Sequence, residues 1–249
     1  MKAMVQWPPL CEIFLVFELL LIRHAQSANN AVHESLRVPD PGITEVGEQQ
    51  AAYLAEWLKT YPPTVLYCSA FRRSLETARP IAQSTNLKPI IRQDIFEWGG
   101  CYEGYIRGEM KPSPGMNRHE IKMRFPGWDV DDRIGDVGWY ADPMMETTEM
   151  AIARSLRVSQ WLRKMFMDLC MESDCKPASA RVALVIHADF KALLLRKLLN
   201  DKSHFGERTF EHLSEVPNTS VTQLTWTGDD WRLDFWSSIG HLPGELLTR

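Results

Sequence analysis

The chain has 249 residues, of which 45% are hydrophobic and 24% charged, as is typical of a globular protein. Its formal net charge is −4, so the sequence lacks the basic balance of a nucleic-acid-binding protein. The apolar run over residues 10–22 is too short to span a bilayer, and Glu12 and Glu18 interrupt it. We therefore expect no nucleic-acid partner and no membrane partner.

The cysteines indicate a reducing compartment. Their number is odd and no Cys-x-x-Cys pair occurs, which favours free thiols in a cytoplasmic protein. The five are Cys11, Cys68, Cys101, Cys170 and Cys175. We expect a single domain over residues 1–249, whose residues 1–17 form an N-terminal extension.

The first predicted strand is the continuous apolar run at residues 19–22, which ends abruptly in Arg23-His24. Such a run is typical of a strand buried on both faces of a parallel sheet. A turn at residues 40–42 then precedes a helix that Thr44 caps and that Pro62 ends. The apolar face expected for this helix consists of Val46, Tyr53, Leu54, Trp57 and Leu58.

A second buried strand is predicted over residues 64–68, followed by a helix that Ser69 caps and that runs toward Asn86. Residues 88–96 are expected to be extended. The next segment, residues 98–145, is rich in Gly, Pro, Trp and Asp, with one short helix expected over residues 117–125. A segment of that length and composition indicates a cap over a site.

Regular structure resumes at Thr148. A long helix is predicted there because apolar residues recur at helical intervals: Ile152, Leu156, Leu162, Phe166 and Leu169. A third buried strand over residues 182–186 ends in His187, and a helix is expected over residues 189–200. Residues 221–226 and 231–236 read as a hairpin at the sheet edge. The order predicts an α/β fold, a three-layer α/β/α sandwich whose mostly parallel, doubly wound sheet carries an inserted cap.

Three strand-to-helix junctions carry residues suited to phosphate chemistry. Arg23-His24, the Ser69 junction with Arg72 and Arg73, and His187 each follow a buried apolar run. In open α/β sheets ligands bind beyond the carboxyl ends of the strands, so these side chains are expected to meet at one edge. Arginines and helix N-termini there favour an anion.

The motifs at these junctions resemble the histidine phosphatase superfamily, the phosphoglycerate mutase-like proteins. The matching stretches are Arg23-His24-Ala25-Gln26-Ser27-x-x-Asn30, Asp40-x-x-Ile43-Thr44-x-x-Gly47, Ser69-Ala70-Phe71-Arg72-Arg73-x-x-Glu76-Thr77-Ala78, His187-Ala188 and Asn218-Thr219-Ser220-Val221. The resemblance covers nearly the whole chain except the N-terminal extension and the cap.

The resemblance implies that His24 attacks phosphorus and forms a phosphohistidine that water later hydrolyses. Arg23, Arg73 and His187 would neutralise the phosphoryl oxygens, and fixed cations would make a metal or other cofactor unnecessary. The implied phosphate-binding set is Arg23, Asn30, Arg73, His187 and Ala188.

Glu97 is the implied proton donor to the leaving group, and Glu103 is its rival. Arg72 is expected to be solvated or structural. The remaining histidines lack metal-ligand spacing and are expected at the surface or in structural roles: His33, His119, His204, His212 and His241.

The chain departs from the family pattern at Ala25 and Ala188, where glycine is usual, and this puts catalytic efficiency in question. We expect a metal-independent phosphatase acting on a phosphorylated small molecule or a phosphoprotein. Two alternatives stay open, a phosphoglycerate mutase and a weakly active phosphate-binding or interaction protein. The sequence does not identify the substrate or the oligomeric state.

Overall fold

The computed structural model describes residues 17–104, 110–172, 180–199 and 216–249. The strands are β1 (Phe17–Arg23), β2 (Val65–Ser69), β3 (Ile90–Arg92), β4 (Tyr102–Glu103), β5 (Lys111–Pro112), β6 (Asp129–Val130), β7 (Ala180–Ile186), β8 (Val221–Trp226) and β9 (Trp231–Ser238). The helices are α1 (Ala28–Ala31), η1 (Glu34–Leu36), α2 (Glu45–Thr60), α3 (Arg72–Thr85), η2 (Gln93–Ile95), α4 (Arg118–Arg124), α5 (Thr148–Glu172), α6 (Ala188–Leu198) and η3 (Gly244–Leu246).

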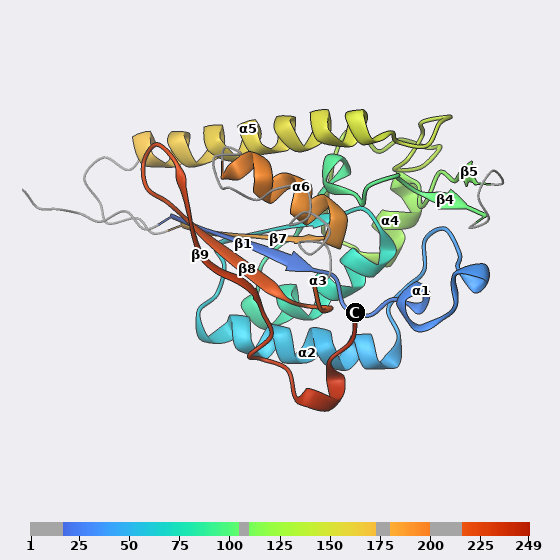
Figure 1. The fold of residues 1–249 in the computed structure, drawn as a ribbon, viewed down its shortest axis with the longest axis horizontal. Helices are drawn as coiled ribbons and strands as arrows, with labels where there is room; N and C mark the ends of the chain where they lie inside the picture. The colour runs from blue at the N-terminus through green and yellow to red at the C-terminus, as the bar shows by residue number, and fades with distance from the viewer. Residues whose placement is uncertain (1–16, 105–109, 173–179, 200–215) are drawn as a thin grey trace, which may run out of the picture.

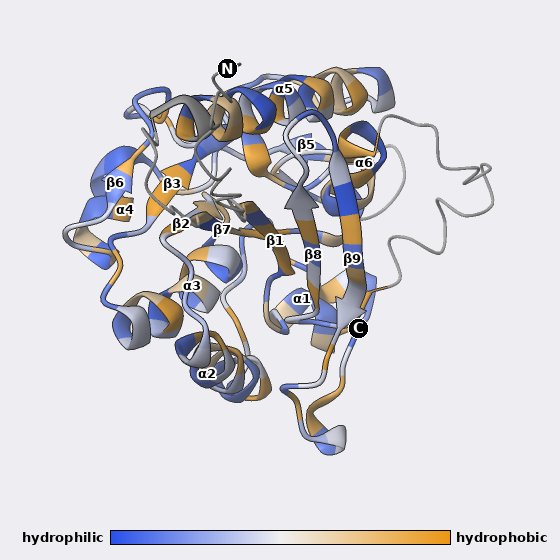
Figure 2. Cartoon of the chain, turned by 90° about the vertical axis from the view of Figure 1, so that its left-hand side faces the viewer, coloured by the Kyte–Doolittle hydropathy of each residue, from blue (hydrophilic) through white to orange (hydrophobic). Residues whose placement is uncertain are grey.

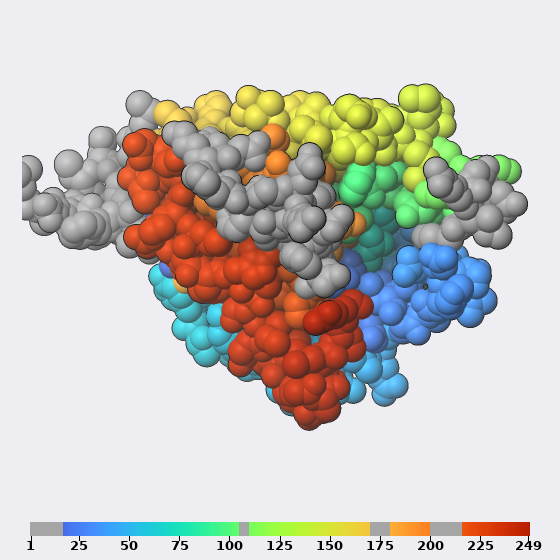
Figure 3. Space-filling view, viewed as in Figure 1, coloured from blue at the N-terminus to red at the C-terminus, as the bar shows by residue number. Residues whose placement is uncertain are grey.

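A seven-stranded sheet with the order β6-β3-β2-β7-β1-β8-β9 forms the middle of the molecule. The five strands from β6 to β1 pair in parallel, and β8 and β9 add an antiparallel hairpin at the edge. This confirms the predicted α/β class with a mostly parallel sheet. In the view of Figure 3 the hairpin lies on the left part of the near face, with α5 along the top.

Helices cover both faces of the sheet and make three layers (Figure 1). One apolar core joins the sheet to α2 and α3 through residues such as Leu54 and Leu75. A second core joins the other sheet face to α5 and α6 through Leu162 and Phe190. Hydrophobic residues run along central strands such as β1 and β3, whereas α2 alternates between hydrophobic and hydrophilic residues (Figure 2). Burial on both faces explains why residues 19–22 of β1 form an unbroken apolar run.

The start of α3 differs from the prediction, because Ser69 is the last residue of β2 and does not cap the helix. The helix begins at Arg72, whose N–H donates to Oδ1 of Asp40 at 2.8 Å. The Ser69 hydroxyl instead lies 2.8 Å from Nε2 of His187. The extended segment expected over residues 88–96 is also shorter, since only Ile90–Arg92 form a strand before the turn of η2.

Two predicted apolar faces were partly wrong. Ile152 and Leu156 are 39% and 45% exposed, because α5 turns Ala151, Val158 and Leu162 toward the sheet. Tyr53 of α2 is likewise exposed. The N-terminal extension lies outside the described residues except for Phe17, which is the first, fully buried residue of β1.

The segment 98–145 is built onto the main domain. Its helix α4 begins after Asn117, as predicted, and β6 extends the parallel sheet beside β3. The Trp139 side chain is fully buried, with its ring centroid 4.3 Å from that of Phe71, which directly precedes α3. Gly115 allows this packing, since at φ +62° a Cβ there would lie 2.1 Å from the Trp139 ring. The segment therefore rests on a junction that carries site residues.

Candidate active site

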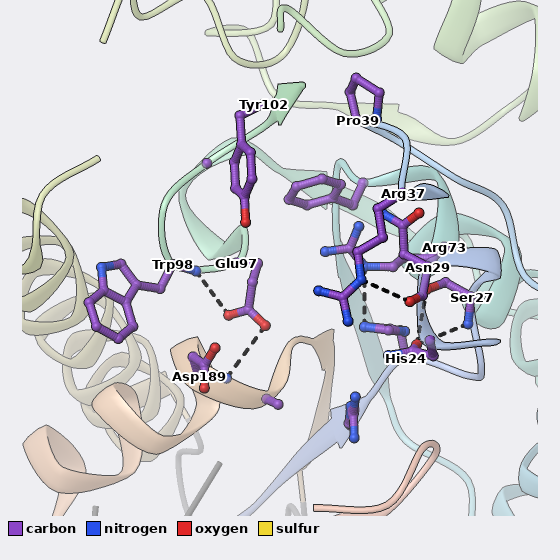
Figure 4. Close-up of a pocket in the computed structure, with 15 residues that line it drawn as sticks. His24, Ser27, Asn29, Arg37, Pro39, Arg73, Glu97, Trp98, Tyr102 and Asp189 are labelled. Carbon is purple, nitrogen blue, oxygen red and sulfur yellow. Dashed lines mark hydrogen bonds between the residues drawn. The ribbon is translucent and has the colours of Figure 1, made fainter. Parts of the chain in front are cut away.

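The sheet register brings the three junctions together. Strand β7 lies between β1 and β2, and Arg23 pairs with Ile186 while Cys68 pairs with Val185, so the three strands end at one level. A cavity of about 320 Å³ opens at this edge (Figure 4). Six of the expected residues line it: Arg23, His24, Asn30, Arg73, Glu97 and Ala188.

The His24 ring is held in one tautomer. Its Nδ1 lies 2.7 Å from the carbonyl oxygen of Ala25, which only accepts, so Nδ1 carries the proton. Nε2 accepts from Nε–H of Arg73 at 3.2 Å, which places its lone pair beside a guanidinium. Burial, followed by the charges of Arg73 and Arg23, holds the pKa of His24 well below its usual range. The site therefore holds a neutral imidazole with an unprotonated Nε2.

Two buried guanidinium groups act on this ring, Arg73 in direct contact and Arg23 within electrostatic reach. Arg23 donates through Nη1 to the carbonyl oxygen of Val216, and its Nε has no hydrogen-bond partner among the described residues. Burial lowers the pKa of Arg23 to about 10, so its charge persists at neutral pH. The Arg73 guanidinium carbon lies 3.8 Å from the ring centroid of Phe71, which fixes its plane. Both cations are therefore preorganised for an anion.

His187 lies deeper, fully buried, with its ring centroid 5.2 Å from that of His24. Its Nε2 contacts the hydroxyl oxygens of Ser69 at 2.8 Å and Ser74 at 3.4 Å. Its Nδ1 is buried without a hydrogen-bond partner within the described ranges. Burial and the nearby Arg73 charge lower the pKa of His187 well below its usual range, so the ring is neutral before a ligand binds.

Glu97 faces the arginines from the opposite wall (Figure 4). Its Oε1 accepts from the N–H groups of Trp98 and Phe190, both at 2.9 Å, so the carboxyl sits against the first turn of α6. Burial, followed by the charge of Asp189, raises the pKa of Glu97 to about 7. The group thus exchanges a proton near neutral pH. The rival Glu103 is exposed on β4 and does not line the cavity.

Asn30 lines the cavity but also has a local structural role. Its Oδ1 accepts from the N–H of Ser27 at 3.1 Å and from the Ser27 hydroxyl at 2.9 Å, in the turn that starts α1. The late motif at residues 218–221 contacts the segment that carries His24, because Nδ2 of Asn218 donates to the His24 carbonyl oxygen at 3.1 Å. The motif therefore positions the His24 backbone.

The two alanines fit without strain. Among the described residues the non-glycine positions with positive φ are Asn86, Thr219 and Ser237, so Ala25 and Ala188 adopt ordinary backbone conformations. Ala25 is fully buried and donates its N–H to the Thr77 hydroxyl at 2.9 Å. The methyl groups therefore do not force the phosphate-binding backbone out of place.

Several lining residues were not predicted. The cavity is also lined by Ser27, Asn29, Arg37, Pro39, Phe71, Trp98, Gly100, Tyr102 and Asp189. The sequence could have indicated Asp189, since it lies two residues after His187 at the start of α6. It gave no indication of Arg37, because that residue follows the short turn η1 in a stretch without periodicity.

Other expected residues lie elsewhere. The Arg72 side chain donates to Glu76 at 2.7 Å, so it is structural. His33 and His119 are exposed, and His241 packs near Trp57 with ring centroids 5.8 Å apart. Cys68 and Cys101 are free and buried. His204, His212 and the other three cysteines lie outside the residues whose side chains are described.

Two further properties concern metals and membranes. Within the described ranges, no three His, Cys, Asp or Glu side chains gather in a set able to hold a metal ion. In the same part of the chain, none of the helices combines the length and apolar character needed to cross a membrane.

The chain belongs to the histidine phosphatase superfamily (branch 1), whose family model matches residues 19–239. A metal-independent phosphoserine phosphatase from Arabidopsis thaliana is 24% identical over 91% of this chain and 84% of its own length. Phosphoserine phosphatase 1 from Hydrogenobacter thermophilus is 36% identical over 33% of this chain, a match that spans only 42% of that relative. A Yersinia enterocolitica protein named "Probable phosphoglycerate mutase GpmB" is 22% identical over 93% of this chain and 98% of its own.

Solved structures share the fold. A phosphoserine phosphatase mutant from Entamoeba histolytica, in complex with phosphoserine, superposes with a TM-score of 0.58 at 22% identity. The match covers 91% of this chain and all of the other. A mycobacterial glucosyl-3-phosphoglycerate phosphatase gives a TM-score of 0.56 at 23% identity, over 89% and 98% of the two chains. Family membership and phosphatase-named relatives support a phosphoric monoester hydrolase.

Proposed function

We propose that the chain hydrolyses phosphomonoesters through a phosphohistidine formed on Nε2 of His24. The observation that carries the proposal is the environment of that nitrogen, which is unprotonated, bonded to Arg73 and within electrostatic reach of Arg23 at the edge of the cavity. A neutral imidazole beside two buried cations is suited to attack an anionic phosphoryl group, because the cations offset the repulsion between lone pair and anion.

In the first step, Nε2 of His24 forms a bond to phosphorus as the ester oxygen departs. The phosphoryl oxygens would pair with the guanidinium groups of Arg23 and Arg73 and with the amide N–H of Asn30. Nε of Arg23 and Nδ1 of His187, which have no hydrogen-bond partner among the residues the structure describes, would gain partners in the same oxygens. Since His187 is neutral before binding, it would act by hydrogen bonding until the phosphoryl charge raises its pKa.

Glu97 would supply the proton that the leaving alkoxide needs. A pKa of about 7 leaves the acid form well populated at neutral pH, which an ordinary glutamate would not achieve. Once the alcohol has left, the carboxylate would accept a proton from water as that water attacks the phosphohistidine. The proton of His24 stays on Nδ1, which donates it in a hydrogen bond to the Ala25 carbonyl oxygen throughout both steps.

Acid-labile labelling tests this proposal. The enzyme is mixed with a phosphorylated substrate carrying labelled phosphorus and quenched in base, and the label should survive base but not acid. His24→Asn should abolish both label and turnover, while Arg72→Lys, outside the cavity lining, should keep them. Stable labelling of H24N would contradict the assignment.

The substrate is a phosphorylated small molecule in this proposal, as for the phosphoserine phosphatases among the relatives. Similarity to a mutase-named relative keeps phosphoryl transfer between positions of phosphoglycerate as the second candidate. Incubation with 3-phosphoglycerate and a bisphosphate primer separates the two, since a mutase yields isomer and a phosphatase yields inorganic phosphate. A cytoplasmic location completes the proposal and is supported by the free thiols of Cys68 and Cys101.

A further inference from the structure

A third arginine reaches the cavity from a different segment. Arg37 follows η1 and lines the cavity together with Asn29 and Pro39. In Figure 4 its side chain extends from the side of the cavity where Arg73 lies, across from Glu97 and Tyr102. The cavity therefore carries one more cation than the proposed phosphoryl site uses.

Hydrogen bonds hold this arginine although it is exposed. The Asn29 side chain clamps the backbone of Val38, donating to its carbonyl oxygen at 2.7 Å and accepting from its N–H at 2.9 Å. Nε–H of Arg37 donates to the carbonyl oxygen of Asn29 at 3.2 Å. A guanidinium that is oriented before a ligand arrives loses less conformational freedom on binding.

The charge of Arg37 acts at the mouth of the cavity. Burial and the Glu97 charge raise the pKa of Tyr102, while Arg37 lowers it, so the two side chains lie within electrostatic reach. At the phosphoryl end the pKa of His24 responds instead to Arg73 and Arg23. Those two cations match the charge of a phosphate dianion. Glu97 and Asp189 lie across the cavity from Arg37 (Figure 4).

We infer that Arg37, with the Tyr102 hydroxyl, forms a second anion subsite that binds the alcohol portion of the substrate. The preferred substrates are phosphate monoesters of alcohols that carry a further anionic group, either a carboxylate or a second phosphate. Planar guanidinium groups bind both through paired hydrogen bonds. The inference rests on the proposed function and adds the substrate class to it.

The test compares matched substrate pairs. O-phosphoserine against O-phosphoethanolamine, and 3-phosphoglycerate against glycerol 3-phosphate, differ by one carboxylate. Fructose 1,6-bisphosphate against fructose 6-phosphate tests a second phosphate. For each pair, the ratio of kcat/KM is measured in wild type, Arg37→Met, Arg37→Lys and the control Arg157→Met. Arg157 is an exposed residue of α5 outside this cavity.

We expect the wild-type ratio to favour the more anionic member in at least one kind of pair. That ratio should fall on the order of tenfold in R37M, fall less in R37K and stay unchanged in R157M. The pair in which it falls identifies carboxylate or phosphate. An equal loss on both members would make Arg37 a phosphoryl ligand and overturn the inference, as would an unchanged ratio. Absence of turnover on every ester, p-nitrophenyl phosphate included, would overturn the proposed function and the subsite with it.

Discussion

Glu97 is the residue whose environment, in the proposed mechanism, most directly sets the pH dependence of the reaction. There its acid form donates the proton, and burial with the Asp189 charge raises its pKa to about 7. The value of kcat/KM for alkyl phosphates should therefore fall as pH rises above 7, approaching tenfold per unit. Glu97→Gln should lower activity on these esters about 100-fold or more and remove that fall.

An activated ester provides the control for this prediction. The leaving group of p-nitrophenyl phosphate needs no protonation, so E97Q should lose far less activity on it than on alkyl phosphates. The values of kcat/KM are measured between pH 5 and 9 for the wild type and for E97Q. The E97Q profile corrects for the ionisation of the substrate itself. A fall above pH 7 that persists in E97Q would assign the titration to another group.

Lys191 is a second residue with a strongly shifted proton affinity. It is fully buried in α6, with the hydroxyl groups of Ser220 at 3.4 Å and Ser237 at 3.5 Å and the Trp236 ring centroid at 5.7 Å. Burial, followed by the Arg23 charge, lowers its pKa to about 7.

This shift predicts a pH-dependent stability. Between pH 7 and about 10.5 the unfolded chain binds a proton that the folded chain does not, so the free energy of unfolding should rise with pH over this range. Lys191→Met should flatten this rise in unfolding free energy. The substitution should stabilise the protein most at pH 7 or below, by a few kcal/mol, since one pKa unit corresponds to about 1.4 kcal/mol. Urea denaturation at pH 7 and 9 measures this, with the exposed Lys59→Met as control. An equal slope in K191M would contradict it.

At the level of elements, Arg154 of α5 forms a buried ion pair with Glu146 and also bonds the segment that carries Glu97. Arg154 binds Glu146 through two bonds of 2.7 and 2.6 Å, and both side chains are buried. Its Nη1 also donates to the carbonyl oxygens of Phe96 at 2.9 Å and Asp94 at 3.1 Å. Its guanidinium lies between the rings of Phe96 and Phe190. The pair therefore fixes the backbone beside Glu97 against α6.

Arg154→Met should cost about 3–5 kcal/mol of unfolding free energy, because it leaves the Glu146 carboxylate buried without its partner. The double variant R154M/E146Q should recover part of that loss, since the stranded charge is gone. The exposed pair of Lys164 and Asp168 on the same helix is the control, and Lys164→Ala should cost less than about 1 kcal/mol. Equal losses in R154M and K164A, measured by urea denaturation, would contradict this role.

The elements also show how far the sequence predicts this fold. The strands that end in Arg23 and His187 were predicted because unbroken apolar runs are distinctive. The core-facing side of α5 was predicted correctly at Leu162 and Phe166 but not in its first turns, because small residues such as Ala151 and Ser155 fill the core side there while Ile152 is exposed. Ser69 resembled a helix cap, but its hydroxyl contacts His187, which is 118 residues away. Arg37 lines the cavity only because of how its loop packs in the folded protein, and no local sequence pattern predicts that position.

At the scale of the whole molecule, the site depends on segments from both ends of the chain. Arg23 and His24 follow β1, Arg73 lies in α3, and Val216 and Asn218 come from the C-terminal part. The site exists only when β1, β7 and β2 are paired in register. A ligand bound there consequently stabilises the global fold, since the unfolded chain presents no comparable site.

Inorganic phosphate should therefore raise the melting temperature with its concentration. At 100 times the dissociation constant the stabilisation is about 2.7 kcal/mol, which for a chain of this size corresponds to roughly 5–10 °C. Arg73→Met should remove most of the shift, because the phosphate loses one of its two buried guanidinium partners, whereas R157M should retain it. Differential scanning fluorimetry in phosphate, against chloride at equal ionic strength, measures the effect. A shift of the same size in chloride or in R73M would show that phosphate acts outside the cavity.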